Sequence, residues 1–227
     1  MASHYDVILR SSGLGVSLGG RRVLSCVDLA IAPQEIVAVQ GTSGSGKTTL
    51  LRVLAGIQLP DVGTVMFDDE NLTAMSDGQR SALRLREFGF VFQFGDLVPE
   101  LTLWENIALP LEFLGVPARD RKDRVDELVR SVGLDRCCEQ LPHTVSGGER
   151  QRAAVARALV HRPHVVFADE PTGSLDTAAR DTVLSMLASM AQQFACALFV
   201  VTHDPWVAHQ CDRIVELVDG RLVEHPR

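Results

Sequence analysis

The stretch GTSGSGKTT, from Gly41 to Thr49, contains the residue types that bind phosphate in proteins. Gly41, Gly46, Lys47 and Thr48 fit the pattern G-x-x-x-x-G-K-[ST]. Glycines let backbone N–H groups point at phosphate oxygens, and the lysine adds a mobile full charge. The threonine hydroxyl is an oxygen ligand that suits Mg²⁺. A glycine-rich turn that carries a lysine by chance is the alternative, but an apolar run before the stretch and a helical pattern after it favour a phosphate site.

Two carboxylates at the end of a later apolar run could complete such a site. Asp169 and Glu170 follow Val165–Ala168, and charges at the end of a buried strand are costly unless they have a partner. We expect Asp169 to bind Mg²⁺ and Glu170 to polarise an attacking water molecule. Alternatively, the two acids only cap the helix that follows. Together with the phosphate-binding stretch, the pair indicates nucleotide hydrolysis.

A second glycine-rich helix start lies at Ser146–Glu149 and has no lysine. Ser146 followed by Glu149 is the pattern of a capping box, which stabilises a helix by about 1 kcal/mol. Gly147 and Gly148 have no part in that pattern, and each weakens the helix by roughly 0.5–1 kcal/mol relative to alanine. Adjacent glycines suit an anion that approaches the backbone closely. The simplest arrangement is a twofold dimer in which this helix start covers a γ-phosphate bound by the other copy.

Short apolar runs alternate with helical stretches along the chain, which predicts an α/β fold around a largely parallel sheet. The runs that suit strands are Ile36–Gln40, Thr64–Phe67, Phe88–Gln93, Val165–Ala168 and Ala197–Thr202. Helices are predicted at 49–56, within 118–134 and within 181–193. Asp219 followed by Gly220 predicts a hairpin near the end of the chain. The stretch from about 94 to 158 is predicted to be a mostly helical insertion, so that the chain forms one domain with two lobes.

The composition argues against several classes of protein. The 227 residues carry a formal net charge of −7 and no long Lys/Arg run, which argues against a nucleic-acid partner. No apolar run approaches the roughly 18 residues of a membrane-spanning helix, and the first residues lack the pattern of a signal peptide. The five cysteines lack CxxC spacing, which favours reduced thiols in the cytoplasm. His161 and His164 flank a proline, so we do not expect them to bind a metal together.

The motifs occur in an order typical of one family. The chain resembles the nucleotide-binding subunit of an ATP-binding cassette (ABC) transporter over nearly its whole length. The matching motifs are Walker A at Gly41–Thr48, the glutamine loop at Gln93, the signature at Val145–Glu149, Walker B at Val165–Glu170, the D-loop at Ser174–Asp176 and the switch histidine His203. The resemblance implies an α/β fold with a P-loop NTPase core, an antiparallel β portion and a helical subdomain. It also implies a single nucleotide-binding domain over residues 5–227 that dimerises around two ATP molecules.

The resemblance further implies a role for each matching residue. Mg²⁺ is expected at Thr48, Gln93 and Asp169. Lys47, Gln93, Glu170 and His203 are expected to act in catalysis, with a hydrogen bond from His203 to the γ-phosphate; a core histidine satisfied by Asp204 is the alternative. Asp176 is expected to cross the dimer interface. The residues expected to contact ATP are Gly41, Thr42, Ser43, Gly44, Ser45, Gly46, Lys47, Thr48, Thr49, Ser146, Gly147, Gly148 and Asp176.

The same resemblance implies partners and a location. We expect a transmembrane permease and a second ABC subunit, usually an identical copy, at the cytoplasmic face of the cell membrane. Residues 88–115 and 168–176 are similar to lipoprotein-release, macrolide-efflux and cell-division ATPases, which implies export or force transmission. An ATP-driven regulatory clamp that transports nothing is the alternative. The stretch Phe94–Leu114 is expected to contact the permease through exposed side chains of Leu97, Leu101 and Trp104, and a core role for these three is the alternative.

One position departs from the family's pattern. An aromatic residue upstream of Walker A usually stacks on adenine, and the matching position here is Leu18. Because stacking of a base on an aromatic ring contributes roughly 1–3 kcal/mol, we expect weaker and less base-selective nucleotide binding. Alternatively, the leucine itself packs adequately on the base.

Overall fold

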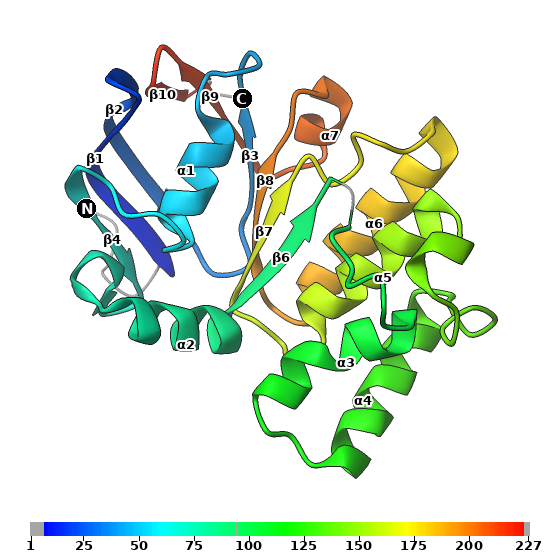
Figure 1. Ribbon diagram of the computed structural model, residues 1–227. Helices are drawn as coiled ribbons and strands as arrows, with labels where there is room; N and C mark the ends of the chain where they lie inside the picture. The colour runs from blue at the N-terminus through cyan, green and yellow to red at the C-terminus, as the bar shows by residue number, and fades with distance from the viewer. Residues whose placement is uncertain (1–6, 94, 225–227) are drawn as a thin grey trace. The chain divides into compact units, whose positions relative to one another are not determined.

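The computed structural model describes residues 7–93 and 95–224 (Figure 1). The chain divides into two compact units, one from Met1–Arg84 with Ala197–Arg227 and the other from Leu85–Cys196. Phe94, in the stretch predicted to contact a permease, is outside the described residues. None of the helices within these ranges combines the length and the apolar character that a membrane span requires.

The first unit contains an antiparallel sheet with the strand order β2-β1-β4-β5. Val27, Leu29 and Ile31 are buried and alternate along β2 with more exposed residues, so one face of the sheet packs on the core. This sheet is the antiparallel portion that the family resemblance implied. The strands are β1 (Leu9–Leu18), β2 (Arg21–Ile31), β4 (Val62–Phe67) and β5 (Glu70–Asn71).

A second set of strands in the same unit has the order β10-β9-β3-β8. β3 (Ile36–Gln40) pairs in parallel with β8 (Ala197–Val201) and with β9 (Arg213–Val218). The first four residues of β3 are all buried, which is typical of a parallel strand covered on both faces. β10 (Arg221–Glu224) is antiparallel to β9, and φ is 47° at Asp219 and 75° at Gly220. Positive φ at both turn residues is the geometry of the predicted two-residue hairpin.

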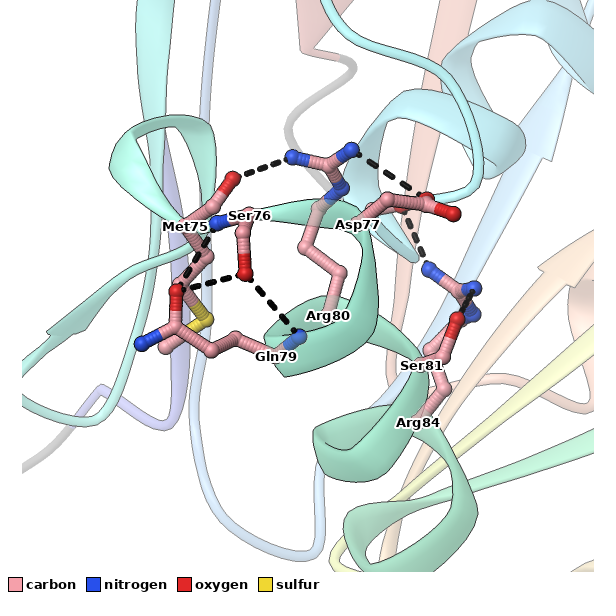
Figure 2. A network of polar contacts seen from close by, with 8 residues as sticks. Met75, Ser76, Asp77, Gln79, Arg80, Ser81 and Arg84 are labelled. Carbon is pink, nitrogen blue, oxygen red and sulfur yellow. Dashed lines mark hydrogen bonds and ion pairs between the residues drawn. The ribbon is translucent and has the colours of Figure 1, made fainter.

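A polar network holds α2 (Asp77–Glu87) against the end of α1 (Lys47–Leu54), as Figure 2 shows for the α2 side. Arg84 donates a hydrogen bond to the carbonyl oxygen of Gly56 at 2.7 Å. Arg80, which is only 9% exposed, donates to the carbonyl oxygen of Met75 and to Asp77 Oδ1 at 3.3 Å. Gly56, with φ of 64°, terminates α1. The network therefore fixes one end of the helix whose other end carries the phosphate-binding residues.

The second unit joins two parallel strands to a group of helices. β6 (Phe88–Phe92) and β7 (Val165–Asp169) pair in register from Phe88 opposite Val165 to Phe92 opposite Asp169. The helices are α3 (Leu103–Phe113), α4 (Ala118–Ser131), η2 (Pro142–Thr144), α5 (Gly147–Leu159) and α6 (Thr177–Gln193). Helix α5 packs on β6, α3 and α6, and residues 153–156 of α5 are all buried.

The elements predicted from the sequence are confirmed, with small shifts at their ends. β3 has the predicted bounds, and β6 and β8 each end one residue earlier than predicted. Helix α6 begins at Thr177 because Asp176 caps it, four residues before the predicted stretch. The sequence did not predict β1, β2, α2, α3 or the short helices η1 (Leu72–Ala74) and α7 (Pro205–His209).

The expectation that Leu97, Leu101 and Trp104 are exposed is wrong. All three are half-buried, and Trp104 Nε1 donates a hydrogen bond to Asp126 Oδ1 at 2.8 Å on α4. The exposed large apolar residue of α3 is Phe113, whose exposed fraction is 69%. Trp104 therefore contributes to packing within the second unit, as the alternative stated.

His161 makes the stability of the second unit dependent on pH. Its Nε2 bonds to the carbonyl oxygen of Phe88 at 3.1 Å, and its buried Nδ1 has no hydrogen-bond partner among the described residues. Burial lowers the pKa of the imidazole, and the bond to Phe88 opposes this effect only in part. The folded pKa thus lies below the unfolded value of about 6.5, so the unfolded chain binds a proton first as the pH falls.

We therefore expect stability to decrease as the pH falls below about 6.5, and we expect a smaller decrease in a His161→Gln variant, which keeps a donor for Phe88. Thermal unfolding midpoints between pH 7.5 and 5.5 would measure both. His143, which is exposed, provides the control variant His143→Gln, whose profile should match the wild type. An unchanged profile for His161→Gln would assign the pH dependence to other groups.

Candidate functional site

The phosphate-binding stretch lies between β3 and α1, as the sequence predicted. Gly41 follows β3 with φ of 152°, and a β-carbon at this position would lie 2.7 Å from the carbonyl oxygen of Leu217. Only glycine fits there. Gly46 is the N-cap residue of α1 with φ of 106°, and it gives the first N–H groups of the helix no side-chain cap. These groups and the positive end of the helix are therefore available to an anion.

Lys47 brings a positive charge to the middle of this loop. The residue is 8% exposed, and its Nζ donates to the carbonyl oxygens of Gly41 at 2.8 Å and Thr42 at 3.0 Å. Ser45 Oγ is buried and has no hydrogen-bond partner within the described part of the chain. A buried ammonium and a buried hydroxyl of this kind fit a polyphosphate, whose oxygens would accept bonds from both. Thr48 and Thr49 lie half-buried in the first turn of α1, and Ser43 and Gly44 are exposed.

His203 lies at the same edge of the first unit's parallel strands. β3 and β8 are in register at Val39 and Val201, and Thr202 N donates to the carbonyl oxygen of Val39 at 3.1 Å. His203 is exposed, so it is not a core histidine. Asp204 Oδ1 accepts from the backbone N–H of Trp206 at 2.8 Å and caps α7. The imidazole therefore has access to a ligand on the phosphate-binding loop.

The carboxylates and Gln93 lie in the second unit. Because Phe92 pairs with Asp169, Gln93 and Glu170 leave adjacent strands at the same edge. Glu170 has φ of 48°, a left-handed backbone conformation that costs a non-glycine residue roughly 1–2 kcal/mol. Strain of this kind persists where the surrounding structure enforces it, often at functional sites. The backbone is thus held in an unusual conformation at the residue predicted to polarise water.

Gln93 is also joined to the segment that contains Asp176. Ser174 Oγ donates to the carbonyl oxygen of Gln93 at 2.8 Å. A β-carbon on Gly173 would lie 2.9 Å from Gln93 Nε2, so the amide side chain lies directly against this glycine. Asp176 is exposed, and its Oδ1 accepts from the N–H of Ala179 at 2.9 Å as the cap of α6. Asp176 therefore caps α6 in its own chain, in addition to the interface role predicted for it.

The second glycine-rich helix start has the predicted capping box. Ser146 Oγ accepts from the N–H of Glu149 at 3.2 Å, and Glu149 Oε2 accepts from the N–H of Ser146 at 2.8 Å. The hydrogen bond from the Ser146 side chain is the main cause that lowers the pKa of Glu149. Ser146, which takes part in both bonds, is exposed at the start of α5.

Gly147 and Gly148 are not required by their own chain. Neither has a positive φ. A β-carbon on Gly147 would lie 3.6 Å from Leu175 Cδ2, and one on Gly148 would lie 3.4 Å from Ala179 Cβ, which are ordinary van der Waals distances. Alanine would fit at both positions in this subunit. A contact from outside the chain explains the glycines better than the chain's own packing does.

Gln151 and Arg157, both on α5, position the loop that contains Gln93. Gln151 is 1% exposed, and its Nε2 donates to the carbonyl oxygen of Phe92 at 2.9 Å. Arg157 donates to the carbonyl oxygens of Gly95 and Asp96, each at 2.8 Å, and burial lowers the pKa of its guanidinium. Neither residue was predicted from the sequence. The sequence feature that could have identified them is the presence of two polar side chains on the buried, alanine-rich side of the helix.

Gln151→Met is expected to lower the free energy of unfolding by about 0.5–1.5 kcal/mol, because it conserves volume but removes one of two donors to the Phe92 carbonyl oxygen, which keeps the N–H of Gly95 at 3.0 Å. Denaturant unfolding would measure the loss. Gln192 on α6 is exposed and provides the control Gln192→Met, which should stay within about 0.5 kcal/mol of the wild type. Equal stability of the two variants would show that the bond to Phe92 contributes nothing.

Comparison with known proteins decides the family. A family model described as ABC transporter matches residues 24–173, about two thirds of the chain, including the phosphate-binding stretch, the second glycine-rich helix start and both carboxylates. The chain belongs to the ABC transporter family. It is an ATP-binding ABC ATPase and the motor subunit of a transporter, which confirms the family, the nucleotide and the enzyme class expected from the sequence.

Relatives of this ABC ATPase cover nearly its whole length. The "Lipoprotein-releasing system ATP-binding protein LolD" of Legionella pneumophila (strain Lens) is 42% identical over 221 residues, which are 96% of this chain and 97% of the relative. The protein of the same description from Bacteroides fragilis (strain YCH46) is 38% identical over 95% of this chain and 100% of the relative. These similarities match the subfamily that the sequence resembled.

A solved structure confirms the ABC ATPase fold class. It is described as "Dimeric structure of a post-hydrolysis state of the ATP-binding cassette MJ0796 bound to ADP and Pi". That chain is 32% identical, with a TM-score of 0.88 over 96% of this chain and 98% of its own length. The α/β fold with its antiparallel portion and helices is therefore that of an ABC cassette.

Proposed function

We propose that this ABC ATPase drives the release of lipoproteins from a membrane through a separate permease, from the cytoplasmic face of that membrane. The observation that supports this most strongly is the similarity of nearly the full chain to lipoprotein-releasing ATP-binding proteins. The same similarity favours an export-type or force-transmitting machine over an importer.

We also propose that the working form is a dimer that encloses two ATP molecules. The related MJ0796 cassette is dimeric with ADP and Pi. In this chain, α1 has no side-chain cap, whereas α5 has one and begins with two glycines that its own packing does not need. This difference suits two functions: the first helix start binds the phosphates, and the second covers them from the other subunit.

In this proposal each side chain has one task. Lys47 and the N–H groups of α1 bind the β- and γ-phosphates. Glu170 accepts a proton from the water that attacks the γ-phosphorus, and His203 donates a hydrogen bond to the γ-phosphate. Thr48, Gln93 and Asp169 would hold Mg²⁺, which neutralises charge on the phosphates when it is bound. Asp176 lies at the boundary with the second subunit.

Copurification from membranes tests the cargo and the partner together. The tagged chain is expected to bring down a permease, and vesicles that contain this complex should release a bound lipoprotein only when ATP is hydrolysed. The Glu170→Gln complex is the matched control, because it should bind ATP and keep the lipoprotein in the membrane. A complex that hydrolyses ATP at full rate without releasing lipoprotein would contradict this cargo and favour a regulatory clamp.

A further inference from the structure

The start of α5 lies against the segment that connects Glu170 to α6. Helices α5 and α6 pack side by side within the second unit (Figure 1). A β-carbon on Gly147 would lie 3.6 Å from Leu175 Cδ2. One on Gly148 would lie 3.4 Å from Ala179 Cβ. Because glycine has no side chain, these two apolar groups face the bare backbone of the helix start that is proposed to cover an ATP molecule.

The connecting segment has a fixed position in the second unit. The N–H of Gly173 donates to the carbonyl oxygen of Glu170 at 3.0 Å, and that of Leu175 donates to the carbonyl oxygen three residues earlier at 3.1 Å. Ser174 Oγ, between them, donates to the carbonyl oxygen of Gln93 at 2.8 Å. The backbone that carries Leu175 is therefore held both to the end of β7 and to the loop of Gln93.

Leu175 is the larger of the two side chains that meet the glycines. Its neighbours Ser174 and Asp176 are exposed, whereas Leu175 is half-buried. The capping-box bonds between Ser146 and Glu149 lie within one helix start, so they shape it but do not place it relative to the rest of the unit. A contact from another segment is needed for that, and Leu175 provides one.

We propose that Leu175 is a positioning residue that places the start of α5 on the ATP bound by the partner subunit. This inference rests on the proposed dimer. Leu175 acts through the backbone of Gly147, so its effect falls on the ATP of the other copy and not on the ATP that its own Lys47 binds. Removing a packed side chain leaves a cavity that its surroundings fill only in part, so the helix start would shift or lose its fixed position.

Leu175→Ala is expected to lower the ATPase rate by about tenfold, because a shift of less than about 1 Å at a covering group is sufficient for such a loss. Leu175→Met conserves the volume and should keep at least about half of the wild-type rate. Leu85, a half-buried leucine on α2, provides the matched control Leu85→Ala, which should stay near the wild-type rate. Phosphate release per folded molecule measures all three variants.

Mixing Leu175→Ala with Lys47→Ala separates an effect on the partner's ATP from an effect on the subunit's own ATP. In a mixed dimer, the Leu175→Ala copy binds ATP with an intact Lys47, and the other copy covers this ATP with an α5 start that keeps its leucine. An equal mixture should therefore reach about a quarter of the wild-type rate, since half of the dimers have one intact site. A rate below that of Leu175→Ala alone would place Leu175 in its own subunit's site and overturn the inference.

A double-mutant comparison tests whether Leu175 acts through the glycines. Adding Leu175→Ala to Gly147→Ala/Gly148→Ala should lower the remaining rate by less than about twofold, because the contact between the leucine and the helix start is already altered. A further tenfold loss would show that Leu175 affects the partner's ATP by another route and would overturn the inference. So would a wild-type rate in Leu175→Ala itself.

Failure of this inference can be distinguished from failure of the proposed dimer. A mixture of Lys47→Ala with Gly147→Ala/Gly148→Ala tests the shared site without any change at Leu175. Recovery in that mixture, without recovery in the mixture of Leu175→Ala and Lys47→Ala, would reject only the role of Leu175. No recovery in either mixture would reject the shared site and the role of Leu175 with it.

Discussion

Glutamine in place of Glu170 is expected to lower the ATPase kcat by about 10²–10⁴-fold while ATP binding is retained. The amide has the size of the carboxylate but cannot accept a proton from the attacking water. The positive φ of this residue is unchanged by the substitution, so the backbone should keep its conformation. Because hydrolysis is blocked after ATP binds, an ATP-bound dimer should accumulate.

Phosphate release measures the loss of turnover, and a sizing column in the presence of Mg-ATP measures the dimer. Glu127 on α4 is exposed and provides the control Glu127→Gln, which should hydrolyse ATP like the wild type. Persistent hydrolysis by Glu170→Gln would remove this residue from the role of general base and leave the strained backbone without a functional reason.

Replacing Gly147 and Gly148 with alanine is expected to raise the stability of the protein and to lower its ATPase activity. Both positions have room for a β-carbon within the subunit and lie in the first turn of α5. The double variant should therefore be about 1–2 kcal/mol more stable than the wild type, since glycine is the poorer helix former. Its ATPase activity should nevertheless fall by about 10²-fold, because a misplacement near 1 Å of the covering helix is sufficient for such a loss.

Denaturant unfolding and ATPase rates on the same preparation test this pair of effects. Ala153→Gly, at a buried position of the same helix, is the opposite control: it should reduce stability more than it reduces activity per folded molecule. If the double variant instead loses stability and activity together, the glycines serve the subunit's own packing, and the contact from outside the chain is not needed.

The sequence predicted the elements whose signals are local. β3, β7 and β8 are continuous apolar runs, the Gly41–Thr49 loop has a fixed pattern, and the capping box of α5 is contained in four consecutive residues. The hairpin at Asp219–Gly220 likewise depends on two neighbouring residues. These features were predicted because short segments determine them.

The missed elements lack such signals. β1 contains two glycines and pairs with β2 through three register shifts, so its apolar residues do not alternate regularly. Helix α3 contains Pro110, and α2 buries only Arg80 and Leu83, so neither has a clear apolar stripe. Strand pairing and packing within the fold stabilise these segments, and a single sequence does not show either.

The roles of some residues also could not be predicted from the sequence. The partners of Gln151 and Arg157 are backbone carbonyl oxygens about 60 positions earlier in the chain. Trp104 was expected at the surface, but its bond to Asp126 on another helix holds it within the second unit. In both cases the deciding contact joins residues that the fold, not the sequence order, brings together.

The most direct test of the composite site mixes two inactive variants. Lys47→Ala lacks the phosphate-binding charge, and Gly147→Ala/Gly148→Ala lacks the covering helix start. If each ATP is bound by one copy and covered by the other, half of the dimers in an equal mixture contain one intact site, and activity should recover to about a quarter of the wild-type rate. A mixture that stays as inactive as its separate components would show that one copy completes the site alone.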